Sequence, residues 1–374
     1  MRKIWAAAFF KLNVVVSLVL AIGIIVSAGV TAGGKAAWAK EPATPELTLQ
    51  QAVEKAVANS KSLKNKGYEV ERTEEVRGSA ADKVKFVPAA GSNPDPTAAA
   101  NFTGLVSADL QWQMAKKSYD AEVDTVTMSV TKAYYGVLQA LESVHVAEQA
   151  YQSKELASRL AMASYRAGAL SKSGLIQADS DLAGAKSDLE AARKALDDAY
   201  QQFNQLVGLW PEDRPVLTGR PSFSALEIDN LDTEVERAVE NSPTLWQAKR
   251  NIDLAKLNLD LYAFNYESEP YKSKEIKVDQ AEVSAASAEE QLRNAVRTIY
   301  YNIRKLEENY AGLQQKLAAA EENLRVTQLK FDLGMATKAD VLSAQYALAG
   351  VQKSLLDTVC QHELLKLSFA KPWA

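Results

Sequence analysis

Apolar residues recur at spacings of three and four through the stretch from residue 175 to residue 206, and large and small side chains alternate along it. The pattern holds for about four heptads, so it predicts a long helix whose apolar stripe packs against another helix, as in a coiled coil. Alanine at every second position allows the two helix axes to come close. The stripe consists of Leu175, Ala178, Leu182, Ala185, Leu189, Ala192, Leu196, Ala199, Phe203 and Leu206.

A second copy of this stretch begins 166 residues further along the chain. The segment Tyr165–Ser171 matches Phe331–Thr337, and the pair at residues 134 and 135 matches the pair at residues 300 and 301. An internal repeat of this length, with matching short motifs, indicates one duplicated unit. The apolar positions Leu175, Leu182, Leu189 and Phe203 return as Val341, Leu348, Leu355 and Phe369.

Each copy has a glycine where a long helix is expected to end. Gly168 and Gly334 can adopt the left-handed conformation that terminates a helix. Ser171 and Thr337 can cap the helix that follows, and Asp340 stands where the second residue of a capping box belongs. We therefore expect each copy to close as a long antiparallel helical hairpin with these glycines at its tip.

An amphipathic helix is expected at the start of each copy, at residues 47–66 and 231–249. The two segments match with an offset of 182 residues, which is sixteen more than the offset at the tips. The second copy has therefore lost sixteen residues between its first helix and its tyrosine pair.

The segment that the second copy lacks has a different pattern in the first. Residues 101–114 alternate between apolar and polar side chains, which predicts a strand with one apolar and one polar face. With the preceding residues it forms an expected β hairpin at about 84–114, and the second copy keeps a truncated insert at about 262–271. The hairpin fits either membrane-spanning strands or an ordinary surface hairpin. The membrane-facing side chains would be Phe102, Val106, Leu110 and Trp112.

Residues 1–39 have the pattern of a secretory signal. A positively charged start precedes an uncharged apolar run at residues 12–30, and an Ala-Trp-Ala cleavage site follows at residues 37–39. The apolar run is also long enough to span a bilayer, so an uncleaved anchor is the alternative. We expect cleavage, because the small-residue site lies at the right distance.

Composition and motifs exclude several classes of protein. The 43 basic and 47 acidic residues leave a net charge of −4 without a basic patch, which argues against a nucleic-acid partner. His145 and His362 lie on different expected helices, and Cys360 is the single cysteine, so neither a recognised metal site nor an intrachain disulfide is expected. There is no P-loop and no G-x-S-x-G motif. We expect no enzyme activity and no cofactor.

The motifs resemble those of the TolC-type outer-membrane efflux protein family. The resemblance covers essentially all of the chain after residue 39, and it is strong in the helical hairpins and weak in the β inserts. It rests on a Leu-Thr-Leu-x-x-Ala start and on the duplicated aromatic-x-x-Gly tip. Its most specific residues are Leu47, Thr48, Leu49, Ala52, Ala56, Asn59, Phe331, Gly334, Thr337, Asp340, Leu342, Ala344 and Gln345.

The resemblance implies a homotrimer. Its long helices would form a hollow α-barrel in the periplasm, continuous with a β-barrel in the lipid of the outer membrane. An inner-membrane transporter, joined by a periplasmic adaptor (a membrane fusion protein), would drive export through it. The hairpin tips would dock the adaptor, and residues just after the second tip would line the closed aperture. The residues implied are Gly168, Ser171, Gly334 and Thr337 for docking, and Asp340 and Ser343 for the aperture.

Two features depart from the family pattern. Ser343 stands where some relatives carry a second acidic residue, so the resemblance does not imply a double acidic ring, and Asp340 fits a simple helix cap equally well. The chain also offers fewer strands than the family pattern requires.

The sequence thus predicts a mainly α, TolC-like protomer of two tandem helical-hairpin repeats with short β inserts. Repeat 1 covers residues 40–210, a linker covers 211–230, and repeat 2 covers 231–374. The leading hypothesis is a passive exit duct for efflux or type I secretion. A non-channel coiled-coil tether of the envelope is the alternative, because of the missing strands. A periplasmic adaptor fits less well, because two hairpins follow in tandem.

Overall fold

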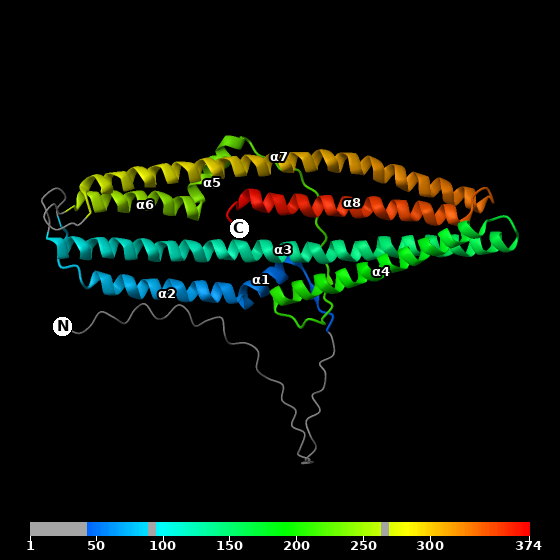
Figure 1. Cartoon of the computed structure of the whole chain (residues 1–374), viewed down its shortest axis with the longest axis horizontal. Helices are drawn as coiled ribbons and strands as arrows, with labels where there is room; N and C mark the ends of the chain where they lie inside the picture. Colours follow the sequence, from blue (N-terminus) through cyan, green and yellow to red (C-terminus); the bar gives the residue numbers. More distant parts are fainter. Residues whose placement is uncertain (1–42, 89–94, 263–268) are drawn as a thin grey trace, which may run out of the picture. The chain divides into compact units, whose positions relative to one another are not determined.

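The residues that the computed structural model describes, 43–88, 95–262 and 269–374, contain eight helices in two rounds of four (Figure 1). This mainly α fold confirms the fold class expected from the sequence. The predicted signal at residues 1–39 lies outside the described residues. The helices are α1 (Leu49–Asn59), α2 (Lys61–Ala81), α3 (Pro96–Arg166), α4 (Lys172–Val207), α5 (Leu231–Asn241), α6 (Pro243–Asp260), α7 (Tyr271–Asp332) and α8 (Lys338–Ala370).

The two longest helices organise the packing. Helices α2 and α4 both pack along α3, while α6 and α8 both pack along α7 (Figure 1). Contacts of α3 with α8 and α6 join the two repeats. Helix α3 has 71 residues and α7 has 62, which correspond to about 107 Å and about 93 Å at the helical rise of 1.5 Å per residue.

Equivalent residues of the two repeats form equivalent cores. Val130 and its repeat partner Val296 are both fully buried, and Phe203 and Phe369 are both buried on the last helix of each repeat. Burying a side chain of this size contributes about 1.5–3 kcal/mol. The apolar stripe expected from the sequence is therefore a true packing seam at this level of the hairpins.

Two short strands tie the start of the first repeat to the linker between the repeats. Strand β1 (Glu46–Leu47) pairs in parallel with β2 (Val216–Leu217). These are the strands that the described residues contain.

The strand expected at residues 101–114 is wrong, because these residues belong to the N-terminal part of α3. The Asp95 side chain accepts a hydrogen bond from the Ala98 amide at 2.8 Å, and Pro96 occupies the first helical turn, so the apparent turn signal is a helix start. Ala108 and Ala115 are buried at a spacing of seven, which continues the helical seam. Of the expected hairpin at 84–114, residues 84–88 are not strand and residues 89–94 lie outside the described part of the chain.

The sixteen residues missing from the second repeat are not a lost hairpin. Helix α3 is nine residues longer than α7, and α2 is three residues longer than α6. The α2–α3 connection is four residues longer than the α6–α7 connection. The additional residues of the first repeat therefore mainly lengthen its helices. In the truncated insert, Tyr271 begins α7, and residues 263–268 lie outside the described residues.

Across the described ranges, no helix combines the length and the apolar character needed to cross a membrane.

Candidate functional site: the two hairpin tips

The two hairpin tips have the same backbone structure. Gly168 and Gly334 both have φ of +73°, the left-handed conformation that glycine adopts without steric cost. The amide of Ala169 donates to the carbonyl of Ser164 at 2.8 Å, and Met335 donates to Lys330 at 2.7 Å. Each tip is therefore a Schellman motif, which pairs carbonyl groups that the helix end would leave unsatisfied.

The helix after each tip begins with a side-chain cap. The Ser171 hydroxyl accepts from the Gly174 amide at 3.1 Å. At the second tip, Thr337 and Asp340 form a complete capping box: the Asp340 amide donates to Thr337 Oγ1 at 3.3 Å, and the Thr337 amide donates to Asp340 Oδ2 at 2.8 Å. The sequence pattern predicted this box, and its geometry shows why Thr337 and Asp340 occur together.

Asp340 is an exposed carboxylate at the start of α8. Hydrogen bonds from the backbone amide and then the hydroxyl of Thr337 lower its pKa. The group is therefore negatively charged at neutral pH. Ser343 is also exposed, one turn further along α8. Glycine occupies the position equivalent to Asp340 in the first repeat, so the tips differ in charge.

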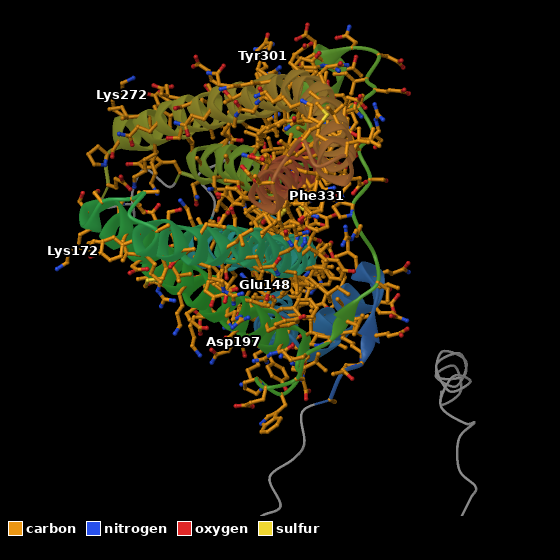
Figure 2. The ribbon with its side chains drawn as sticks, turned by 90° about the vertical axis from the view of Figure 1, so that its right-hand side faces the viewer. Glu148, Lys172, Asp197, Lys272, Tyr301 and Phe331 are labelled. Carbon is orange, nitrogen blue, oxygen red and sulfur yellow. The ribbon has the colours of Figure 1, made fainter. Side chains whose placement is uncertain are left out.

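The tips also differ in apolar surface, which the sequence reasoning missed. Leu333 and Met335 flank the second glycine and are 75% and 74% exposed. Their equivalents in the first repeat are Ala167 and Ala169. Figure 2 labels Phe331 at the end of α7, where its side chain is 36% exposed. Comparing the repeats residue by residue would have revealed the substitutions, but only the structure shows that these large side chains lack cover.

The expected membrane-facing residues do not join the tips. Phe102, Val106, Leu110 and Trp112 lie in the N-terminal part of α3, and Figure 1 shows this part at the end of the helix opposite to the tips. In a helix, Phe102, Val106 and Leu110 lie along one face at spacings of four, whereas Trp112, two residues after Leu110, points away from that face. Trp112 packs under a cation instead, with Lys116 Nζ 3.3 Å from its ring centre. The prediction of a membrane-facing strand is therefore corrected.

The two histidines lie apart from the tips. His362 is fully buried on α8, with Nε2 3.4 Å from the Glu307 carboxylate, while His145 lies on α3 beside Glu142. In the part of the chain that the structure describes, no group of three or more His, Cys, Asp or Glu residues could hold a metal ion.

The match to a family of known proteins lies within the second repeat. The model of the outer membrane efflux protein family matches residues 254–361, which extend from α6 to α8. No curated relative matches the chain in sequence.

Solved structures match the fold over most of the chain. The structure of CusC, described in terms of folding and transmembrane channel formation, has a TM-score of 0.63 at 13% identity, covering 90% of this chain and 95% of that one. The CmeC outer membrane channel of Campylobacter jejuni has a TM-score of 0.62 at 12% identity and covers 94% of both chains. The open MtrE outer membrane channel of Neisseria gonorrhoeae has a TM-score of 0.60 at 14% identity, covering 87% of this chain and 88% of that one.

The fold is that of the chains in these channel structures. The family model, together with the fold, confirms the resemblance to the TolC-type outer-membrane efflux protein family. The family and the neighbouring structures are those of channel proteins and not of enzymes, as expected from the motifs.

Proposed function

We propose that the chain is the protomer of a trimeric, passive exit duct of the outer membrane, for efflux or type I secretion. The observation that carries this proposal is the pair of matched hairpin tips, which lie at the same end of the helical unit (Figure 1). A duct made of such protomers has one ring of tips. The expected signal at residues 1–39 would direct the chain to the periplasm. The end of the duct opposite to the tips would then lie in the outer membrane.

The second tip is suited to bind a periplasmic adaptor. Leu333 and Met335 expose large apolar side chains on a rigid Schellman turn, and burying such side chains against a partner is favourable. At the first tip, Gly168 lies between Ala167 and Ala169, which allows a close backbone approach, and Ser171 follows two residues later. The inner-membrane transporter would then act through the adaptor rather than by direct contact.

The aperture in this proposal is formed by the first turn of α8. Asp340 is charged and exposed there, and Ser343 follows on the same helix. Three copies would place three carboxylates around the entrance. Repulsion among these carboxylates, which are ionised at neutral pH, would favour an open ring, and bound cations would allow closure.

A double substitution at the second tip tests the docking role. Leu333→Ser with Met335→Ser should abolish export by cells while leaving oligomer mass and thermal stability unchanged, because both side chains are exposed. The matched control is Ala167→Ser with Ala169→Ser, at the equivalent positions of the first tip. Unchanged export by the Leu333/Met335 variant would contradict adaptor docking at this tip.

The alternative is a non-channel tether of the envelope. The observation that favours it is the helical structure of residues 101–114, where the duct hypothesis expected a strand. Single-channel recording in a planar bilayer separates the two functions, with oligomer mass measured in the same detergent. Discrete conductance steps support the duct. A stable oligomer without conductance, even after Asp340→Ala, supports the tether.

A further inference from the structure

A cavity of about 830 Å³ lies where the two repeats meet the linker between them. Its lining comes from α3, from α7 and α8, and from linker residues 220–223. This volume is in the range of cavities that bind small molecules. It is distinct from the tips, because the residues of α8 that line it start at Gln352, more than three turns after Asp340.

The linker that covers the cavity is held in place. The Phe223 ring stacks on the Tyr310 ring with 3.7 Å between centres and 9° between planes, and it also contacts the buried His362 ring. The Leu226 amide donates to the Glu307 carboxylate at 2.7 Å, and Lys366 Nζ donates to the Ser224 hydroxyl at 2.7 Å. These contacts hold Phe223 and the linker residues that follow it against α7 and α8, so the aromatic wall is in place before any ligand binds.

The floor of the cavity is apolar. It consists of Leu355, Leu356 and Val359, which face the linker from α8. Val359 is 6% exposed, and the two leucines are half-buried. Such a floor favours an apolar group, because covering it removes apolar surface from water.

The rim of the cavity carries a positive charge that has no ion-pair partner among the described residues. Arg220 is exposed and makes no hydrogen bond or ion pair with any of the described residues. Arg214, on the same linker, binds Asp197 at 2.9 Å and two carbonyl groups, so a free arginine is not a general property of this segment. The acid on the lining, Glu142, lies 3.4 Å from His145 Nδ1. A guanidinium group of this kind binds carboxylate or sulfonate groups through two parallel hydrogen bonds.

We propose that this cavity binds a small amphipathic monoanion, with its acidic group on Arg220 and its apolar body on the α8 floor against the Phe223 wall. Such a ligand touches α3 of the first repeat, α8 of the second repeat and the linker at once. It therefore joins the two repeats, and its binding is independent of adaptor docking at the tips.

Isothermal titration of the full chain, purified in a neutral maltoside detergent, tests the site with 1-naphthalenesulfonate as the probe. We expect one site per chain, and binding at least tenfold weaker for Arg220→Gln. Gln352→Trp, which places an indole over the floor from an exposed position, should abolish binding. Arg159→Gln removes one positive charge from α3 outside the cavity and should change affinity less than twofold.

A charge series of ligands completes the test. The neutral 1-naphthalenemethanol should bind at least tenfold more weakly than the sulfonate, and the cationic 1-naphthylmethylamine should not bind. Circular dichroism melting should show the same unfolding temperature for all three variants. Absence of binding by the wild-type chain, equal binding by Arg220→Gln, or equal affinity for the neutral alcohol would overturn the proposal.

Discussion

The hydroxyl oxygen of Tyr134 lies 2.9 Å from both the amide nitrogen and the carbonyl oxygen of Gly219. This side chain is fully buried in the first core, and its ring packs edge-on against Phe203. The hydroxyl group of Tyr134 thus binds the linker between the repeats to the middle of α3. The equivalent Tyr300 accepts a hydrogen bond from Arg304 on its own helix instead.

Tyr134→Phe should lower the free energy of unfolding by about 1–3 kcal/mol, because it leaves the partly buried amide and carbonyl groups of Gly219 without their partner. Urea denaturation followed by circular dichroism measures this change. The control is Tyr301→Phe, since Tyr301 is 63% exposed on α7 (Figure 2). Equal stability of the Tyr134→Phe variant and the wild-type chain would show that the linker is held by other contacts.

Replacing glycine by alanine should lower the stability of the folded chain at a tip and raise it within a helix. Gly334→Ala should destabilise the chain by about 1 kcal/mol, because alanine at φ of +73° is strained even though its Cβ meets no atom within 4 Å. Gly312→Ala, also with open space around the new Cβ, should stabilise α7 by about 0.5–1 kcal/mol. Thermal melting of both variants checks the signs, and a stabilising Gly334→Ala would contradict the left-handed tip.

The capping box should make the start of α8 sensitive to acid. Asp340 has a lower pKa in the folded chain than in the unfolded chain, so its stabilising effect is present above the unfolded value of about 4 and is lost as pH falls through the folded value. Asp340→Ala should therefore speed amide hydrogen exchange at residues 337–341 at neutral pH, above all at Thr337, whose amide donates to the Asp340 carboxylate. The difference from the wild-type chain should disappear in acid. Asp332→Ala, before the tip, should leave exchange at these amides unchanged at every pH.

The single cysteine should be unreactive until the chain unfolds. Cys360 is fully buried, and burial, with a smaller effect of Asp357, raises its pKa to about 12. The raised pKa alone lowers the thiolate fraction at pH 8 more than about a thousandfold relative to an ordinary cysteine. Ellman's reagent should detect no thiol in the native protein and one thiol in urea. Ser343→Cys, at an exposed position, should add one thiol that reacts at once in the native protein.

The sequence predicted the parts of the fold that depend on local signals. Both tips combine a glycine with a following Ser or Thr cap, and these residues are sufficient to end one helix and start the next. The offsets between the copies predicted that helices occur at equivalent places. The contact between Tyr134 and Gly219 could not be predicted, because 85 residues separate the partners and neither has a local signal for it.

The error at residues 101–114 has a definite cause. An alternating pattern and a helical seam both place apolar residues at spacings of four, as between Phe102 and Val106. These residues therefore could not distinguish a strand from a helix. Asp95 and Pro96 held the deciding information, since an N-cap followed by proline starts a helix. At the tips, the sequence identified the turn residues but not the exposed Leu333 and Met335, whose role depends on what surrounds them in space.

Unbroken and interrupted helices alternate across the unit. Helices α3 and α7 each run without a break, whereas the column beside each is made of two helices, α2 with α4 and α6 with α8 (Figure 1). In the proposed duct, each repeat would contribute one continuous helix and, beside it, one column of two helices with a break between them. A twist applied at the tips would be transmitted along the full length of α3 and α7. The interrupted columns would instead bend at their breaks, beside α1 or α5. In the proposed duct, a change in the width of the entrance would therefore pivot at these breaks rather than at the tips.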